Sequence, residues 1–229
     1  MGRAQQDLAE IPADGHCLYR AVAQQLMQHG SEGVEEDYSE DSLLRVNGTF
    51  RTPLYMDSPY TGSRAVRDED GLPVFQGWTD APFTMLVPRQ QGDEGAEPAR
   101  LLSFGHGLMG EGRGEGGGGF LQELGQRYNM VTVATDWQGM SVPDIATVGI
   151  ALSDVGTFPS TGERLMQGVI NNLVMTRSFK GACRDLPELQ GAAGPYIDAG
   201  PPYWLGISQG GIMGGTLMAL SQDTTRGAL

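Results

Sequence analysis

The stretch WLGISQGGIMGG, from Trp204 to Gly215, carries the pattern Gly-x-Ser-x-Gly around Ser208. An apolar segment precedes the serine, as in a buried strand, and a run rich in small residues follows it, as in a helix packed close to a sheet. In this pattern the serine lies on a sharp strand-to-helix turn, and glycines two positions away remove side chains that would collide there. We therefore expect the Ser208 hydroxyl to project from the end of a strand. The alternative is an ordinary strand–turn–helix connection that happens to contain a serine.

Strand and helix patterns alternate along the chain that leads to this turn. Short apolar and β-branched segments predict strands, and longer amphipathic segments predict helices. Strands are expected over 43–55, 81–89, 100–105, 130–137 and 202–208, and helices over 120–129, 161–181 and 209–223. Strands come first and helices then follow strands in turn, which favours an α/β fold with a mostly parallel sheet flanked by helices.

The composition limits the classes of partner. Of the 229 residues, 39% are hydrophobic and 19% charged, which is typical of a folded chain, and the net charge is −13. Such a charge repels the phosphates of nucleic acid and of anionic lipid, so we expect neither as a partner. No apolar run is long enough to span a bilayer and no signal peptide is visible, so we expect a cytoplasmic protein.

Neither a cofactor nor a metal is expected. The glycine run EGRGEGGGG, residues 111–119, does not end in GKS or GKT, so it is not a phosphate-binding loop and is interpreted as a flexible insertion. Three scattered histidines and two cysteines have no ligand spacing. The cysteines, Cys17 and Cys183, are interpreted as two free thiols in a reducing compartment.

The chain divides into three parts by composition. Residues 1–30 are helix-prone, with an uninterrupted pattern from Cys17 to His29. Residues 31–42 are rich in acids and contain no basic residue, which indicates a solvated linker. Residues 43–229 then form the large α/β domain.

A second glycine-rich loop, SFGHGLMG, follows the predicted strand that begins at Arg100. In hydrolases with a serine on such a turn, one backbone N–H of the oxyanion hole comes from the residue after the serine, here Gln209. The other comes from a loop of the type His-Gly, here His106 and Gly107. We expect the backbone of this loop to bind the oxyanion, with His106 orienting the loop and not acting as a base.

Residues 45–229 resemble the N-terminal half of an α/β-hydrolase, of a group of bacterial esterase- or lipase-like proteins. The resemblance implies that Ser208 is the nucleophile, that small carboxylic esters are the substrate, and that Gly107, Leu108 and Gln209 line the oxyanion hole. It also implies that two residues after a central strand shape the rim of the pocket. The stretches that carry it are APFTMLVPR, FGHGLMG, VATDWQGMS, RLMQGVINNLVMTR and GISQGGIMGG, and the rim residues are Asp136 and Trp137.

The triad of this fold is incomplete in the sequence. Its order is serine, acid, histidine, but the only acid after Ser208 is Asp223, which lies in or just after the following helix. No histidine follows, since His16, His29 and His106 all precede the serine. The sheet is also expected to lack its last strands, which leaves an open apolar edge that a partner chain would cover.

A second nucleophile candidate lies in the segment IPADGHCLYRAVAQQL, residues 11–26. Cys17 begins the predicted helix, where free N–H groups and the helix dipole stabilise a thiolate. Residues 8–28, which include this segment, resemble the catalytic cysteine segment of ovarian-tumour (OTU) family deubiquitinases. That resemblance implies that Cys17 is a nucleophile, that Asp14 helps to form an oxyanion hole, and that ubiquitin is the partner. The later histidines, His29 and His106, do not supply its base.

Three hypotheses follow. The first is a serine hydrolase acting on carboxylic esters through Ser208, impaired by the missing triad members. The second is an OTU-type cysteine deubiquitinase that uses Cys17. The third is a non-catalytic remnant that is stable only with a partner chain.

Overall fold

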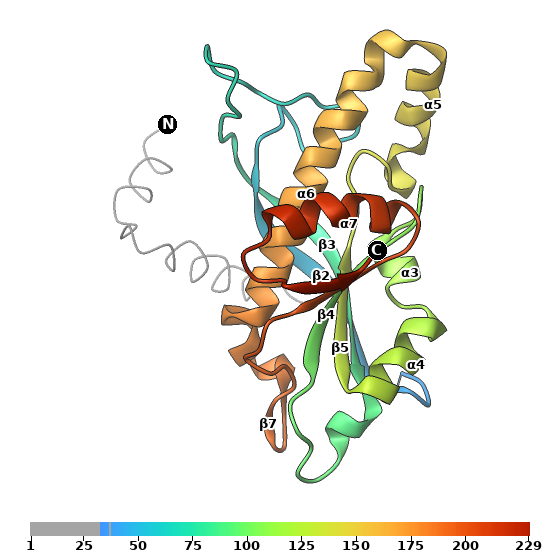
Figure 1. The fold of residues 1–229 in the computed structure, drawn as a ribbon, viewed down its shortest axis with the longest axis vertical. Helices are drawn as coiled ribbons and strands as arrows, with labels where there is room; N and C mark the ends of the chain where they lie inside the picture. The colour runs from blue at the N-terminus through green and yellow to red at the C-terminus, as the bar shows by residue number, and fades with distance from the viewer. Residues whose placement is uncertain (1–32, 37) are drawn as a thin grey trace.

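The computed structural model describes residues 33–36 and 38–229 (Figure 1). The helix expected over residues 17–29 lies outside the described residues. So do Asp14 and Cys17, the two residues of the OTU-like segment. Nothing in the structure therefore bears on that hypothesis.

The described residues form a seven-stranded mixed sheet in the order β1-β2-β3-β5-β4-β8-β9. The first strands pair antiparallel and β5, β4, β8 and β9 run parallel. The α/β class is confirmed, and the sheet is antiparallel in its N-terminal half. The strands are β1 (Gly33–Glu36), β2 (Ser42–Leu54), β3 (Gly77–Pro88), β4 (Arg100–Gly105), β5 (Met130–Thr135), β8 (Tyr203–Gly206) and β9 (Arg226–Ala228). A separate small hairpin pairs β6 (Gln190–Gly191) with β7 (Gly194–Pro195).

Helices cover both faces of this sheet (Figure 1). Helix α3 (Gly112–Glu115) and helix α4 (Gly119–Tyr128) pack on β3 and β5. On the other face, α6 (Phe158–Lys180) packs on β2, β4 and β5, and α7 (Gln209–Leu220) packs on β4 and β8. Helix α5 (Ile145–Ser153) packs against α6 and not against the sheet. The expected helices over 120–129, 161–181 and 209–223 therefore correspond to α4, α6 and α7.

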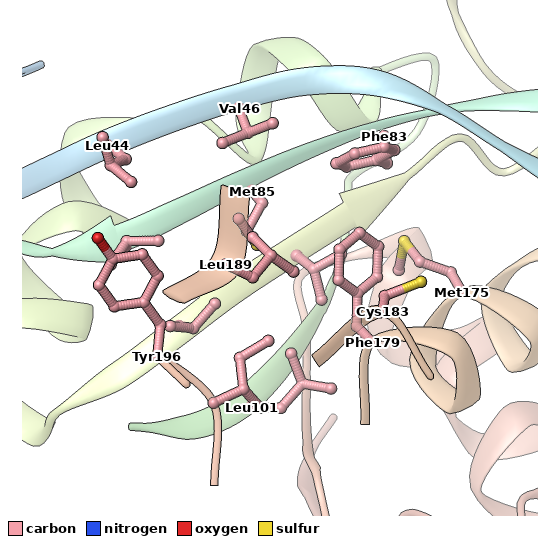
Figure 2. Close-up of a cluster of buried hydrophobic side chains, with 14 of the residues drawn as sticks. Leu44, Val46, Phe83, Met85, Leu101, Met175, Phe179, Cys183, Leu189 and Tyr196 are labelled. Carbon is pink, nitrogen blue, oxygen red and sulfur yellow. The ribbon is translucent and has the colours of Figure 1, made fainter. Parts of the chain in front are cut away.

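The largest core lies between the sheet and α6, as Figure 2 shows. Successive residues of β2 alternate between buried and half-buried, because side chains of a strand point to opposite faces in turn. The buried face brings Val46 and, from the neighbouring strand, Phe83 against Met175 and Phe179 of α6. The rings of Phe83 and Phe179 meet edge to face, with centroids 5.0 Å apart.

Two acidic residues of the expected linker lie in the sheet. Residues Gly33–Glu36 form β1, which pairs antiparallel with β2 and places Val34 opposite Val46. The side chains of Glu35 and Glu36 are exposed. Backbone pairing with the long strand β2 is compatible with an acidic sequence, because charged side chains on an edge strand remain in water. The division into three parts by composition stays a prediction.

The glycine run 111–119 is not a flexible insertion. It contains α3 and the start of α4, and its glycines allow close packing on the sheet. A Cβ at Gly112 would lie 2.8 Å from the backbone of Thr135, and a Cβ at Gly116 would lie 2.6 Å from the side chain of Ala134. Gly112 and Gly116 have no room for a side chain, because the chain passes close to β5 at these two positions.

The thiol of Cys183 provides a test of this core. It is fully buried and free, and burial raises its pKa to about 12. Because the thiolate is the reactive form, we expect iodoacetamide at pH 8 to leave Cys183 unmodified in the folded chain and to modify it in urea. Peptide mass mapping of the two samples measures this. Rapid modification of Cys183 in the folded chain would contradict the core described here.

Candidate active site

Ser208 lies between the end of β8 and the start of α7, in a strained backbone conformation. Its φ is 55° and its ψ is −115°, whereas residues with a side chain rarely adopt a positive φ. Conformations of this kind cost about 1–3 kcal/mol and are found mainly at functional sites. The residue is exposed to solvent. The predicted strand, tight turn and helix are therefore present, with the serine at the turn.

Three glycines make this turn sterically possible. A Cβ at Gly206 would overlap the carbonyl group of Gly210, and a Cβ at Gly210 would overlap the carbonyl group of Gly105 at the end of β4. A Cβ at Gly105 would in turn lie 2.6 Å from the ring of Trp204. The end of β4, the end of β8 and the first turn of α7 thus meet without room for a single extra carbon atom.

The loop after β4 lies next to Ser208. The position of a Cβ on Gly107 is 3.9 Å from the Cβ of Ser208. Within residues 38–229, neither the N–H of Leu108 nor the N–H of Gln209 has a hydrogen-bond partner. The N–H of Gly107 donates to Oε2 of Glu115 at 2.9 Å. Two of the three backbone donors expected around the serine are therefore free, and the third is occupied by a carboxylate.

His106 is fully buried beside this loop, and its ring is bonded to backbone at both nitrogens. Its Nε2 lies 2.8 Å from the N–H of Trp137 and accepts a hydrogen bond from it. The proton of a neutral imidazole is then on Nδ1, which donates to the carbonyl oxygen of Gly107 at 2.7 Å. The ring joins the loop to the end of β5 and has no nitrogen left to accept a proton from Ser208.

The two residues expected at the pocket rim have other surroundings. Trp137 is fully buried and packs edge to face against Trp204, with ring centroids 5.7 Å apart, so it belongs to the core between the sheet, α6 and α7. Asp136 accepts a hydrogen bond from the N–H of Gly112 at 2.8 Å, at the start of α3. Burial raises the pKa of Asp136, against the hydrogen bond from Gly112 and the positive charge of Arg113, which lower it.

Asp223, the only acid after Ser208, is bonded to α6. It forms ion pairs with Arg177 and, at 3.1 Å, with Lys180. Burial by itself would raise the pKa of Asp223, but hydrogen bonds from Arg177 and Lys180 and their positive charges lower it below its ordinary value. This carboxylate joins the loop after α7 to α6. Its partners are thus two cations, and no histidine of the described residues contacts it.

The loop after β4 is also tied to the segment that leads into α5. The N–H of Met109 donates to the carbonyl of Met140 at 3.1 Å, and the N–H of Val142 donates to the carbonyl of Gly110 at 3.0 Å. The same segment contains Asp144, which forms a buried ion pair with Arg164 of α6 at 3.1 Å. The side chains of Asp144 and Arg164 are 1% and 4% exposed. The position of the loop therefore depends on α6 as well as on β4.

The sequence did not indicate two polar side chains at this site. Glu115 lies in the glycine run, eight residues after the Gly107 that it contacts, and no motif has that spacing. The side chain of Gln209 is only 6% exposed, and both atoms of its amide lack a partner within the described residues. A buried amide without hydrogen-bond partners lowers the free energy of unfolding by about 1–3 kcal/mol, so the side chain of Gln209 destabilises the fold beside Ser208.

Three structural facts bear on cofactors and partners. Within residues 38–229 no cluster of histidine, cysteine and acidic residues is arranged to hold a metal ion, and none of the helices there is long and apolar enough to cross a membrane. A groove of ≈410 Å³ lies away from Ser208, between α4 and the edge of the sheet. Its lining is almost wholly apolar and consists of Leu102, Leu124, Tyr128, Met130, Tyr203, Trp204, Leu205, Arg226, Gly227 and Ala228.

Comparison with solved structures finds esterases. They include a cold-adapted esterase from an Arctic intertidal metagenomic library (15% identity, TM-score 0.45, covering 86% of this chain and 64% of that one). They also include a candidate acetyl xylan esterase from Bacteroides fragilis (13% identity, TM-score 0.49, 92% and 50%). A third is the rice cell wall degrading esterase LipA from Xanthomonas oryzae (13% identity, TM-score 0.35, 83% and 42%).

The chain spans no more than 64% of the length of these three esterases. At TM-scores below 0.5, the description of the fold rests on the sheet order and the turn of this chain itself. No protein-family model matches the chain, and no curated protein does. The OTU resemblance of residues 8–28 therefore finds no support.

The glycine contacts at the turn predict opposite effects of two substitutions in the same helix. Gly210→Ala places a Cβ inside the carbonyl of Gly105 and is expected to lower the free energy of unfolding by about 1–3 kcal/mol or more. Gly215→Ala has no atom within 4 Å and is expected to raise it by roughly 0.5–1 kcal/mol, because alanine favours helix over glycine. Urea denaturation measures both. Equal effects of the two substitutions would contradict the close contact.

The raised pKa of Asp136 predicts a dependence of stability on pH. The pKa of Asp136 in the folded chain lies above its unfolded-state value of 3.8. Between these two pKa values the folded chain binds more protons than the unfolded chain, so the free energy of unfolding decreases as the pH rises through this range. Asp136→Asn keeps the acceptor for Gly112 without the charge. Its melting temperature is expected to exceed that of the original chain at pH 7, with a difference that shrinks toward pH 4. Thermal melts across this range, with the exposed Asp93→Asn as control, measure the effect; a variant that is less stable at pH 7 would contradict it.

Proposed function

We propose that this chain carries the nucleophile of a serine hydrolase of α/β-hydrolase type that acts on carboxylic esters, with Ser208 as the nucleophile. One observation carries the proposal. Ser208, a residue other than glycine, has a positive φ between a strand and a helix, and the neighbouring glycines have no room for a Cβ. An ordinary strand–turn–helix connection does not require a strained backbone conformation at the turn.

The free N–H groups beside Ser208 give the reaction its electrostatic component. Attack of Ser208 Oγ on the ester carbonyl forms a C–O bond and turns the carbonyl oxygen into an oxyanion. We assign the N–H groups of Leu108 and Gln209 as its hydrogen-bond donors, with Gly107 in the wall of the site. Each donor of this kind contributes about 3–4 kcal/mol to stabilising the transition state in enzymes where it has been removed. Collapse of the oxyanion expels the alcohol and leaves an acyl-enzyme that water hydrolyses.

The proton of Ser208 needs an acceptor, and the described residues do not offer one. Both nitrogens of His106 are bonded to backbone, and we assign this residue to orienting the loop. Asp223 is paired with two cations. We propose that the base comes from outside the described residues. Without it, Ser208 remains a weakly nucleophilic alcohol, and the rate falls by several orders of magnitude relative to a complete triad.

The surroundings of Ser208 favour an uncharged, apolar ester. Leu108, which carries one of the two proposed donors, and Ile207, which precedes Ser208, are 61% and 44% exposed although they are apolar. The carboxylate of Glu115 lies against Gly107, and the net charge of the chain is −13, so an anionic substrate would be repelled. The expected partner chain stays a prediction. The apolar groove beside β8 and β9 is the surface that it would cover.

Covalent labelling with a fluorophosphonate probe tests the nucleophile. We expect slow labelling of the full chain that disappears in Ser208→Ala and persists in Cys17→Ala. Mass spectrometry of the modified peptide identifies the site. A folded chain that is not labelled over many hours would contradict an activated serine, and labelling that disappears only in Cys17→Ala would favour the cysteine hypothesis.

A further inference from the structure

The side chain of Glu115 folds back from α3 over the oxyanion loop. Its Oε2 accepts the hydrogen bond from the N–H of Gly107 at 2.9 Å, and its Oε1 occupies the space that a Cβ of Gly110 would fill. Gly110 therefore lacks a side chain where the carboxylate of Glu115 lies. A hydrogen bond from a backbone N–H to a carboxylate is among the stronger ones in proteins, and this one, although exposed to solvent, connects Gly107 to the end of α3.

The carbonyl group of Gly107 is also hydrogen-bonded within the protein. The carbonyl oxygen of Gly107 accepts from the N–H of Gly110 at 3.1 Å and from Nδ1 of His106 at 2.7 Å. With Glu115 on its N–H, Gly107 has no backbone group left for a ligand. The next N–H along the loop, that of Leu108, has no partner within residues 38–229. The carboxylate of Glu115 thus determines which donor of the loop is available.

We propose that Glu115 is a positioning residue of the serine site. It holds Gly107 so that Leu108, and not Gly107, supplies the oxyanion donor of this loop. The proposal rests on the proposed function of Ser208. Glu115 acts through Gly107 and does not touch the reacting atoms.

The charge of Glu115 is not what this role requires. A carboxylate close to a developing oxyanion repels it, and the hydrogen bond to Gly107 needs only an acceptor. Glu115→Gln keeps an acceptor oxygen and removes the charge, whereas Glu115→Ala removes both. If Glu115 acted only through its charge, Glu115→Gln and Glu115→Ala would have the same effect, because both remove the charge.

The experiment compares the full chain with Glu115→Gln, Glu115→Ala and the control Glu123→Ala, which removes an exposed acid from α4. The first measurement is the fluorophosphonate labelling of Ser208, separated into the maximal labelling rate and the probe concentration at half-maximal rate. The second is amide hydrogen exchange of the peptide that covers residues 105–112.

We expect Glu115→Ala to lower the maximal labelling rate about ten- to a hundredfold, since a misplaced group commonly costs up to that factor, with the half-maximal concentration unchanged. Amide exchange of the loop is expected to be faster in Glu115→Ala. Glu115→Gln is expected to label at least as fast as the original chain and to keep the slow exchange. Glu123→Ala is expected to match the original chain in both measurements.

The outcomes separate this proposal from the function on which it rests. If the original chain is labelled and Glu115→Ala is labelled at the same rate or faster, Glu115 does not position the loop and the inference is wrong, while the role of Ser208 stands. If no variant is labelled, the proposed function is wrong. Amide exchange then tests only whether Glu115 positions the loop: faster exchange of residues 105–112 in Glu115→Ala alone supports that positioning, and equal exchange in all variants overturns it.

Discussion

The contact between the first turn of α7 and the end of β4 is the constraint on which the rest of the site depends. Gly210 lies against the carbonyl of Gly105, and Gly206 lies against the carbonyl of Gly210. Because three backbone segments meet there without side chains between them, the chain has to reverse direction within two residues. Ser208 takes up that reversal in its positive φ, and the strain holds its side chain in solvent.

The same contact fixes the loop after β4, because that loop begins directly at Gly105. Hydrogen bonds to three neighbouring parts of the chain then determine its path. His106 connects it to β5, Glu115 connects it to α3, and the bonds of Met109 and Val142 connect it to the segment before α5. Each bond uses a backbone group, so the loop's shape depends on helix and strand positions more than on its own side chains. The N–H of Leu108 in this loop and the N–H of Gln209, the residue after Ser208, remain without a partner within residues 38–229.

The loop beside Ser208 is thus held by several backbone hydrogen bonds, whereas the described residues offer no acceptor for the serine proton in the proposed reaction. The buried pair of Asp144 and Arg164 connects the segment before α5 to α6, with side chains that are 1% and 4% exposed. Removing either partner would leave the other charge buried and unpaired, which is strongly destabilising. Asp223, by contrast, contributes its charge to α6. The turn at Ser208 and the loop after β4 come from β4, β8 and α7, and β5, α3 and the segment before α5 hold the loop. The proton acceptor that we propose for Ser208 lies outside the described residues.

Local pattern in the sequence determined the strand–turn–helix around Ser208, the alternation of strands and helices, and the pairing of this turn with the loop at His106. These follow from residue spacing and from glycines that only a crowded backbone requires. The antiparallel half of the sheet, the edge strand at Gly33–Glu36 and the close packing of the glycine run on Thr135 were decided by tertiary structure. An acidic or glycine-rich segment has no local preference strong enough to predict where its backbone pairs. For the same reason the roles of Trp137 and Glu115 were not readable, because each depends on a neighbour that only the folded sheet brings within contact distance.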